Sequence, residues 1–214
     1  MKILTEFEAK KLLSKYKIKI TEGRIAGSPD EAFDIASRIG TPVAMKISSP
    51  DISHKSDVGG VLLNVKKEDV IKTYEEMITR IRKMVPAANI EGILIQQMAP
   101  PGHEIIVGLK KDAQFGYALM FGLGGIFVEV YKDVSFRVAP IEKRDALAMI
   151  SEIKGYPILK GIRGRKPADI GSIADVLVYV SELAEKENII EFDINPLIVN
   201  ESGAIAVDAR AMVE

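Results

Sequence analysis

The chain has 214 residues, of which 47% are hydrophobic, enough for one large domain or for two lobes that share a cleft. A net charge of -1 predicts no broad electrostatic surface for nucleic acid. The absence of cysteine excludes disulfides, thiolate catalysis and zinc–sulfur sites, and it favours a cytoplasmic location. No apolar run has the length of a transmembrane span, so no membrane association is expected.

The first elements have clear boundary signals. Thr5 and Glu8 form a capping box for a helix over residues 5–16, and alternating residues predict a strand over 18–25. Ser28, followed by proline and two acidic residues, predicts the start of a second helix that ends at Gly40.

The stretch from Val43 to Val61 is the most informative part of the chain. A short apolar strand leads into Lys46, a polar loop with His54 follows, and a glycine pair precedes a second apolar run. Strand ends and the loops beyond them often carry the chemistry of α/β proteins. Lys46 is expected to be exposed to a cleft, where a phosphate is its natural partner. A β-hairpin with a solvated loop explains the same residues equally well.

A charged helix over about residues 68–84 leads to a run of apolar segments that predict strands. One of them ends in Gln97 and Met98, which could present backbone groups and an adaptable apolar contact to an adenine. Another ends in a glycine loop with Gly124 and Gly125, which could lie against phosphates or form an ordinary turn. Strands are also expected at 127–131 and 134–139.

Two helices, over about 143–153 and 173–186, and two strands, over 189–194 and 204–209, complete the chain. Asp193 and Asn195 would share one face of a strand, and an antiparallel return would bring Asp208 to the same face. Side-chain oxygens together with nucleotide phosphates are how Mg²⁺ is usually held, although solvated acids at an Asn-Pro turn are the simpler explanation. The mixed order of strands and helices predicts an α+β fold.

Four segments together resemble the ATP-grasp fold, and more closely the β subunit of ADP-forming acetyl-CoA synthetases. They are SHKSDVGGV (53–61), PGHEIIVGLKKDAQFG (101–116), FGLGGIFVEV (121–130) and FDINPLIV (192–199). The resemblance covers the whole chain, and the β subunit of succinyl-CoA synthetase is a more distant relative. It implies one ATP-grasp domain over residues 1–214, with mixed or antiparallel sheets in two lobes, 22–95 and 96–214, that enclose a nucleotide cleft. The helix over 5–16 is expected to pack on the second lobe.

The resemblance also implies residue roles. His54 would carry the phosphoryl group on a mobile loop. Asp193, on the same face as Asn195, would orient a histidine or its phosphorylated form. ATP or ADP would be bound by Lys46, the adenine hinge of Gln97 and Met98, Glu104, Gly124, Gly125 and Arg137. Mg²⁺ would be held by Asn195 and Asp208. From its position after Pro-Pro-Gly, His103 is expected to be a structural or surface residue.

The implied partner is a CoA-binding α subunit in an α2β2 assembly, because the chain has no GxGxxG after a strand and no second domain for CoA. The implied reaction is acyl-CoA + ADP + phosphate ⇌ acid + CoA + ATP. Two alternatives remain open: an ATP-grasp ligase that uses acyl phosphate without a phosphohistidine, and a non-catalytic nucleotide-binding subunit.

Overall fold

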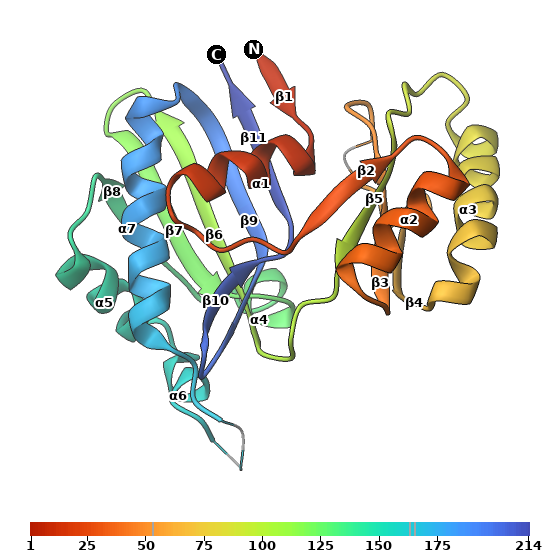
Figure 1. The fold of residues 1–214 in the computed structure, drawn as a ribbon. Helices are drawn as coiled ribbons and strands as arrows, with labels where there is room; N and C mark the ends of the chain where they lie inside the picture. The colour runs from red at the N-terminus through yellow and green to blue at the C-terminus, as the bar shows by residue number, and fades with distance from the viewer. Residues whose placement is uncertain (53, 163, 165) are drawn as a thin grey trace. The chain divides into compact units, whose positions relative to one another are not determined.

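The computed structural model describes residues 1–52, 54–162, 164 and 166–214, and Figure 1 shows its ribbon. Ser53, which opens the first of the four segments above, lies outside the described residues. The chain divides into two compact units. Unit 1 comprises Met1–Ile20 and Ala99–Glu214, and unit 2 comprises Thr21–Met98.

Unit 1 is built on a seven-stranded antiparallel sheet. Its strands are β1 (Lys2–Leu4), β6 (His103–Asp112), β7 (Gly116–Leu123), β8 (Val134–Ala139), β9 (Ile189–Asn200), β10 (Gly203–Ala206) and β11 (Ala209–Val213). The strand order is β1-β11-β9-β6-β7-β8, and β10 pairs with β9 beyond the end of β11. The first and last strands of the chain are therefore neighbours, with Lys2 opposite Val213 (Figure 1).

Helices cover one face of this sheet (Figure 1). They are α1 (Glu6–Lys15), α5 (Lys143–Glu152), α6 (Tyr156–Leu159) and α7 (Ile170–Lys186). The short helix α4 (Ile126–Glu129) follows β7, and its Val128 lies beside Gly122 of that strand. Leu13 of α1 and Leu177 of α7 are fully buried in one core with Phe121 and Phe192 of the sheet. Each such side chain contributes about 1.5–3 kcal/mol relative to exposure, so α1 is an integral part of unit 1.

Unit 2 is a four-stranded antiparallel sheet in the order β2-β5-β3-β4, with two helices. Its elements are β2 (Gly23–Ala26), α2 (Pro29–Ile39), β3 (Val43–Ser48), β4 (Val61–Val65), the 3₁₀ turn Lys67–Asp69, α3 (Val70–Met84) and β5 (Gly92–Gln97). Ile35 of α2 and Met77 of α3 pack on Met45 and Ile95 to form a separate core. Unit 2 runs beyond residue 95 to Met98, because β5 continues to Gln97.

The helix boundaries confirm the capping signals. The Thr5 side chain accepts from the backbone N–H of Glu8, and the carboxylate of Glu8 accepts from the N–H of Thr5 at 2.9 Å. Ser28 accepts from the N–H of Glu31 at 3.2 Å, directly before Pro29. These bonds satisfy N–H groups that the first turn of a helix leaves unpaired, so local sequence alone fixes both starts.

The strand predicted over 189–194 is too short, since β9 continues to Asn200, and three other predicted strands are wrong in extent or type. Residues 18–25 cannot form one strand, because Ile18 is buried in the core of unit 1 whereas Ile25 pairs in the sheet of unit 2. Residues 127–131 do not form a strand: α4 occupies Ile126–Glu129, and the carbonyl of Gly125 accepts from the N–H of Val128 to start a helical turn. The strand predicted over 204–209 is interrupted, since β10 ends at Ala206 and β11 begins at Ala209.

Candidate functional site

The sheet of unit 1 has two chemically different faces. Side chains of Val107, Phe121 and Phe192 point into the core beneath the helices. Their neighbours in sequence point the other way, because successive residues of a strand alternate. This second face, which we call the outer face, includes Gly108, Met120 and Asp193, and register pairs Gly108 with both of the other two.

The break between β10 and β11 brings Asn195 and Asp208 together. The backbone N–H of Asn195 donates to the carbonyl of Asp208 at 3.1 Å, and the N–H of Val207 donates to the carbonyl of Pro196 at 3.0 Å. The Asn195–Pro196 peptide bond is cis. The antiparallel return expected for this part of the chain is confirmed. It brings the backbones of Asn195 and Asp208 together. These residues carry an amide oxygen and a carboxylate, which are ligand types that suit Mg²⁺ when water and phosphate complete its coordination.

Among the described residues, no three histidine or acidic side chains are grouped to hold a metal ion by themselves. The Asn195–Asp208 pair fits a metal that arrives with a nucleotide better than a permanently held structural ion. Mg²⁺ bound through one or two protein oxygens and substrate phosphates follows that pattern.

Asp193 is half-buried on the outer face of β9. Burial raises the pKa of its carboxyl group and the nearby Glu191 adds to the shift, whereas Arg210 and Lys110 oppose it. Arg210 stands directly opposite Asp193 in the β9–β11 pair. Carboxyl groups whose pKa is raised by burial and shifted by nearby charges are found often at functional sites. Asp193 is therefore a functional-site candidate.

Glu104 lies next to the glycine loop. The backbone N–H of Gly124 donates to the carbonyl of Glu104 at 2.8 Å, and a β-carbon at Gly124 would lie 3.1 Å from that of Glu104. Gly125 has a φ of +61°, in the left-handed region that favours glycine. The structure therefore groups these three predicted nucleotide-binding residues at one end of β6 and β7.

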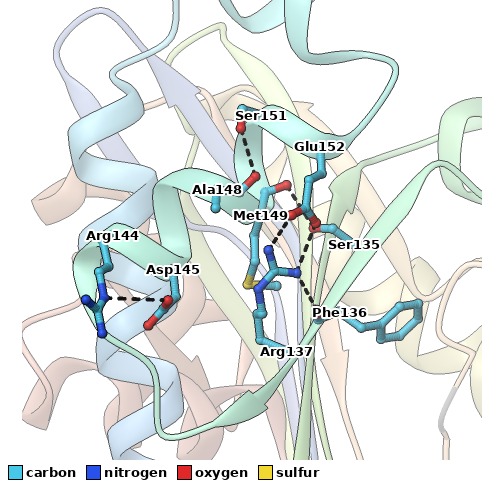
Figure 2. Close-up of polar contacts among 9 residues, drawn as sticks. All are labelled: Ser135, Phe136, Arg137, Arg144, Asp145, Ala148, Met149, Ser151 and Glu152. Carbon is cyan, nitrogen blue, oxygen red and sulfur yellow. Dashed lines mark hydrogen bonds and ion pairs between the residues drawn. The ribbon is translucent and has the colours of Figure 1, made fainter.

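Arg137 lies apart from that group. It stands opposite Leu119 in the β7–β8 pair, on the helix-covered face of the sheet. Its guanidinium donates to both carboxylate oxygens of Glu152 on α5 and to the carbonyl of Phe136, as Figure 2 shows. The bond to Glu152 raises the pKa of Arg137. The Arg137 side chain therefore pairs with Glu152 on the face of the sheet opposite Asp193. No contact within unit 1 supports the phosphate-binding role expected for Arg137.

In unit 2, Lys46 differs from its expected setting. It lies within β3 rather than at its end, between Val61 of β4 and Leu94 of β5, and only 4% of it is exposed. The expectation of an exposed lysine is wrong for this reason. Burial makes an ammonium group costly unless it is paired with anions, so Lys46 has the setting of a lysine that binds a specific anionic group.

The predicted adenine hinge lies at the end of β5. Gln97 is exposed and Met98 is half-buried, whereas the preceding Gln96 is only 1% exposed. The backbone N–H of Gln97 already donates to the carbonyl of Glu22 at 2.8 Å. Contacts from Gln97 to a base would therefore use its carbonyl or side chain, and an N–H contact would come from Met98.

His54 is exposed in the loop that joins β3 to β4. Its carbonyl accepts from the N–H of Asp57 at 3.2 Å, the first of a series of local turns. An exposed imidazole in a polar loop is accessible to other reactants, as a nucleophilic phosphoryl carrier must be.

Sequence reasoning missed Gly108. A β-carbon at this position would lie 3.2 Å from Oδ1 of Asp193 and 3.2 Å from Cε of Met120, so the missing side chain makes room for the carboxylate. The available signal was a glycine inside an otherwise apolar strand, a pattern that marks close approach of a neighbouring group.

Comparisons with known proteins identify the family of this chain. The ATP-grasp domain family matches residues 1–213. The β subunit of acetate–CoA ligase (ADP-forming) I from Pyrococcus furiosus is 52% identical over 212 residues, which cover 98% of this chain and 91% of that subunit. Acetate–CoA ligase (ADP-forming) I from Archaeoglobus fulgidus is 50% identical over 203 residues, which cover 94% of this chain and 30% of that longer protein.

Solved structures give the same result. The dinucleotide forming acetyl-coenzyme A synthetase 1 from Ca. Korarchaeum cryptofilum, in complex with coenzyme A and Ca-AMPCP, matches with a TM-score of 0.97 and 49% identity. The match covers 100% of this chain and 94% of that one. Another complex of that enzyme contains Mg-AMPPCP and has its phosphohistidine segment pointing towards the nucleotide binding site.

The chain thus belongs to the ATP-grasp family and, within it, to the β subunits of ADP-forming acetate–CoA ligases. The resemblance and the α+β, ATP-grasp fold expected from sequence are confirmed. Within the residues that the structure covers, no helix has the length and apolar character needed to cross a membrane.

Proposed function

We propose that this chain is the nucleotide-binding β subunit of an ADP-forming acyl-CoA synthetase that catalyses acyl-CoA + ADP + phosphate ⇌ acid + CoA + ATP. The observation that carries the proposal is the pairing of Asn195 with Asp208 in a chain that belongs to the ATP-grasp family. In this role the chain passes phosphate between a phosphohistidine on its partner and ADP, with His54 as the intermediate carrier.

Unit 1 supplies the metal ligands and the phosphate-facing backbone. Asn195 and Asp208 would hold Mg²⁺, which would supply positive charge next to the phosphates. Glu104, Gly124 and Gly125 lie beside the nucleotide. Asp193 orients a histidine or its phosphorylated form by accepting a hydrogen bond from one imidazole nitrogen, which leaves the other nitrogen to carry the phosphoryl group.

Unit 2 supplies the cation, the adenine contacts and the carrier. Lys46 pairs with nucleotide phosphates, and Gln97 and Met98 contact the base. In the direction of ATP formation, the bond between phosphorus and the His54 nitrogen breaks, and a bond forms to a terminal phosphate oxygen of ADP. Phosphoryl transfer needs mainly alignment and charge neutralisation, which these groups provide.

The partner in this proposal is a CoA-binding α subunit, in an α2β2 complex in the cytoplasm. The longer Archaeoglobus relative, of which this chain spans 30%, is consistent with a second functional part elsewhere. A ligase that uses acyl phosphate directly would not need His54, and a non-catalytic subunit would not need the Asn195–Asp208 pair.

Labelling of His54 tests the proposal, because the chain has only two histidines. The full chain, with and without its copurified partner, is incubated with γ-labelled ATP and Mg²⁺. Acid-labile, base-stable label is expected on the wild-type protein and lost in His54→Ala. The matched control is His103→Ala, since Nε2 of His103 lies 3.1 Å from the carbonyl of Lys166 in unit 1. Full acyl-CoA-dependent ATP synthesis by the His54→Ala complex would favour direct transfer instead.

A further inference from the structure

The loop that carries His54 is attached at its start to the segment before β5. The backbone N–H of Asn89 donates to Oδ2 of Asp51 at 2.7 Å, and the N–H of Asp51 donates to Oγ of Ser49 at 3.2 Å. One step earlier, Oγ of Ser48 donates to the carboxylate of Glu91 at 2.9 Å. Asp51 therefore ties the entry of the loop to the chain that leaves α3.

The end of the loop is attached to α3 itself. Gly59 has a φ of +64°, and its carbonyl accepts from a terminal guanidinium nitrogen of Arg80 at 3.5 Å. A β-carbon at Gly59 would lie 2.7 Å from that nitrogen and 3.3 Å from Cδ of Arg80. The Arg80 side chain thus packs directly over a backbone position that only glycine accommodates.

Between these two attachments the loop folds on itself. The N–H of Gly60 donates to the carbonyl of Lys55 at 2.7 Å, and the N–H of Gly59 donates to the carbonyl of Ser56 at 3.0 Å. Beside the first attachment, Ile52 is buried in the core of unit 2. His54 therefore lies on a compact turn whose two ends are held by α3 and the segment that follows it.

We propose that Asp51 and Arg80 are positioning residues for His54: they hold the two ends of its loop and so set the range over which the imidazole moves. This inference rests on the proposed function, in which His54 must meet a partner's phosphohistidine and then ADP. A loop held too loosely presents the nucleophile in many geometries, and transfer slows because alignment is lost. A purely structural role would alter stability without altering transfer.

Amide hydrogen exchange on the full chain tests the attachment. Asp51→Asn and Arg80→Ala are expected to raise exchange of the amides of residues 54–60 about fivefold to tenfold. Asp51→Asn weakens one hydrogen bond at the base of the loop by removing the charge of its acceptor, and Arg80→Ala removes the other. Arg80→Lys, which keeps one donor, should fall between Arg80→Ala and wild type. Lys83→Ala on α3 and Asp34→Asn on α2 remove exposed charges and serve as controls. Exchange equal to that of these controls overturns the inference.

The second readout is the rate of His54 labelling from γ-labelled ATP and Mg²⁺. Slower labelling in Asp51→Asn and Arg80→Ala, at unchanged Mg·ADP affinity and thermal midpoint, supports positioning. Raised exchange with an unchanged labelling rate overturns it. A wild-type chain that takes no label at His54 with its partner present counts against the proposed function, whereas unchanged exchange counts against the attachment, so the two failures are distinguishable.

Discussion

Gly108 stands directly opposite Asp193 in the β6–β9 pair, and the space of its missing side chain is taken up by the Asp193 carboxylate. Gly108→Ala would place a β-carbon 3.2 Å from Oδ1 of Asp193, so the carboxylate must move by a few tenths of an ångström. If Asp193 orients a histidine during phosphoryl transfer, as proposed, labelling of His54 should fall about threefold to tenfold, because small misplacements of an orienting group are costly in rate. Mg·ADP affinity should not change.

The double variant provides the control. Gly108→Ala should have no further effect on transfer in an Asp193→Asn background, since both substitutions then act on the same contact. An equal loss in both backgrounds would mean that the alanine disturbs the sheet rather than the carboxylate.

Asp208→Asn is expected to weaken Mg·ADP binding by tenfold or more while the fold survives, because an amide oxygen replaces a charged ligand of a hard cation. Isothermal titration calorimetry with Mg·ADP, and with ADP in EDTA, measures the effect. Only the metal-dependent part of the affinity should fall. Glu201→Gln is the control, since Glu201 is an exposed acid paired with Lys166 at the tip of the β9–β10 hairpin. Unchanged Mg·ADP affinity in Asp208→Asn would remove Asp208 from the metal site.

Arg137→Met should leave Mg·ADP affinity unchanged, because the guanidinium pairs with Glu152 on the helix-covered face. Its cost should be a loss of about 1 kcal/mol or less in the free energy of unfolding, as for other partly exposed ion pairs. Denaturant unfolding and Mg·ADP calorimetry measure the two quantities, with the exposed Arg144→Met on α5 as control. A tenfold loss of nucleotide affinity in Arg137→Met alone would restore the phosphate role expected from sequence.

The hydrogen bond of Tyr16, at the end of α1, should make the free energy of unfolding depend on pH. Burial, with a hydrogen bond from its hydroxyl to Glu187 at 3.0 Å, raises the pKa of Tyr16 to about 12. An unfolded chain releases this proton near pH 10, whereas the folded chain keeps it, so folding stability is lost as pH rises from about 10 to 12. In Tyr16→Phe the free energy of unfolding should fall less steeply over that interval. Identical slopes for both proteins would contradict the assignment.

Local signals predicted the parts of the fold that depend on neighbours in sequence. Local residues indicate each of these helices. The signals are the capping box at Thr5, the cap at Ser28 with the proline that follows it, and the apolar periodicity of α3 and α7. The β9–β10 hairpin followed in the same way from its short turn. The long contiguous segments then indicated the family, which neither composition nor periodicity alone could do.

Features set by distant parts of the chain were not predictable in this way. One local feature was also missed, because residues 127–131 have a strand-like composition, yet the turn at Gly125 starts a helix there. The burial of Lys46 depends on β4 and β5, which lie later in the sequence. The position of Arg137 on the helix-covered face depends on the register of β8 against β7, which a shift of one residue would reverse.

The pairing of β1 with β11 brings the two ends of the chain to one edge of the sheet of unit 1. A polypeptide joined before Lys2 and one joined after Val213 would therefore both be attached at the same end of the β1–β11 pair. One would run into the protein and the other out of it, because the two strands are antiparallel. A second protein fused to either end would therefore be attached at nearly the same position on unit 1. The order of the two proteins along a fused chain then has little effect on that position.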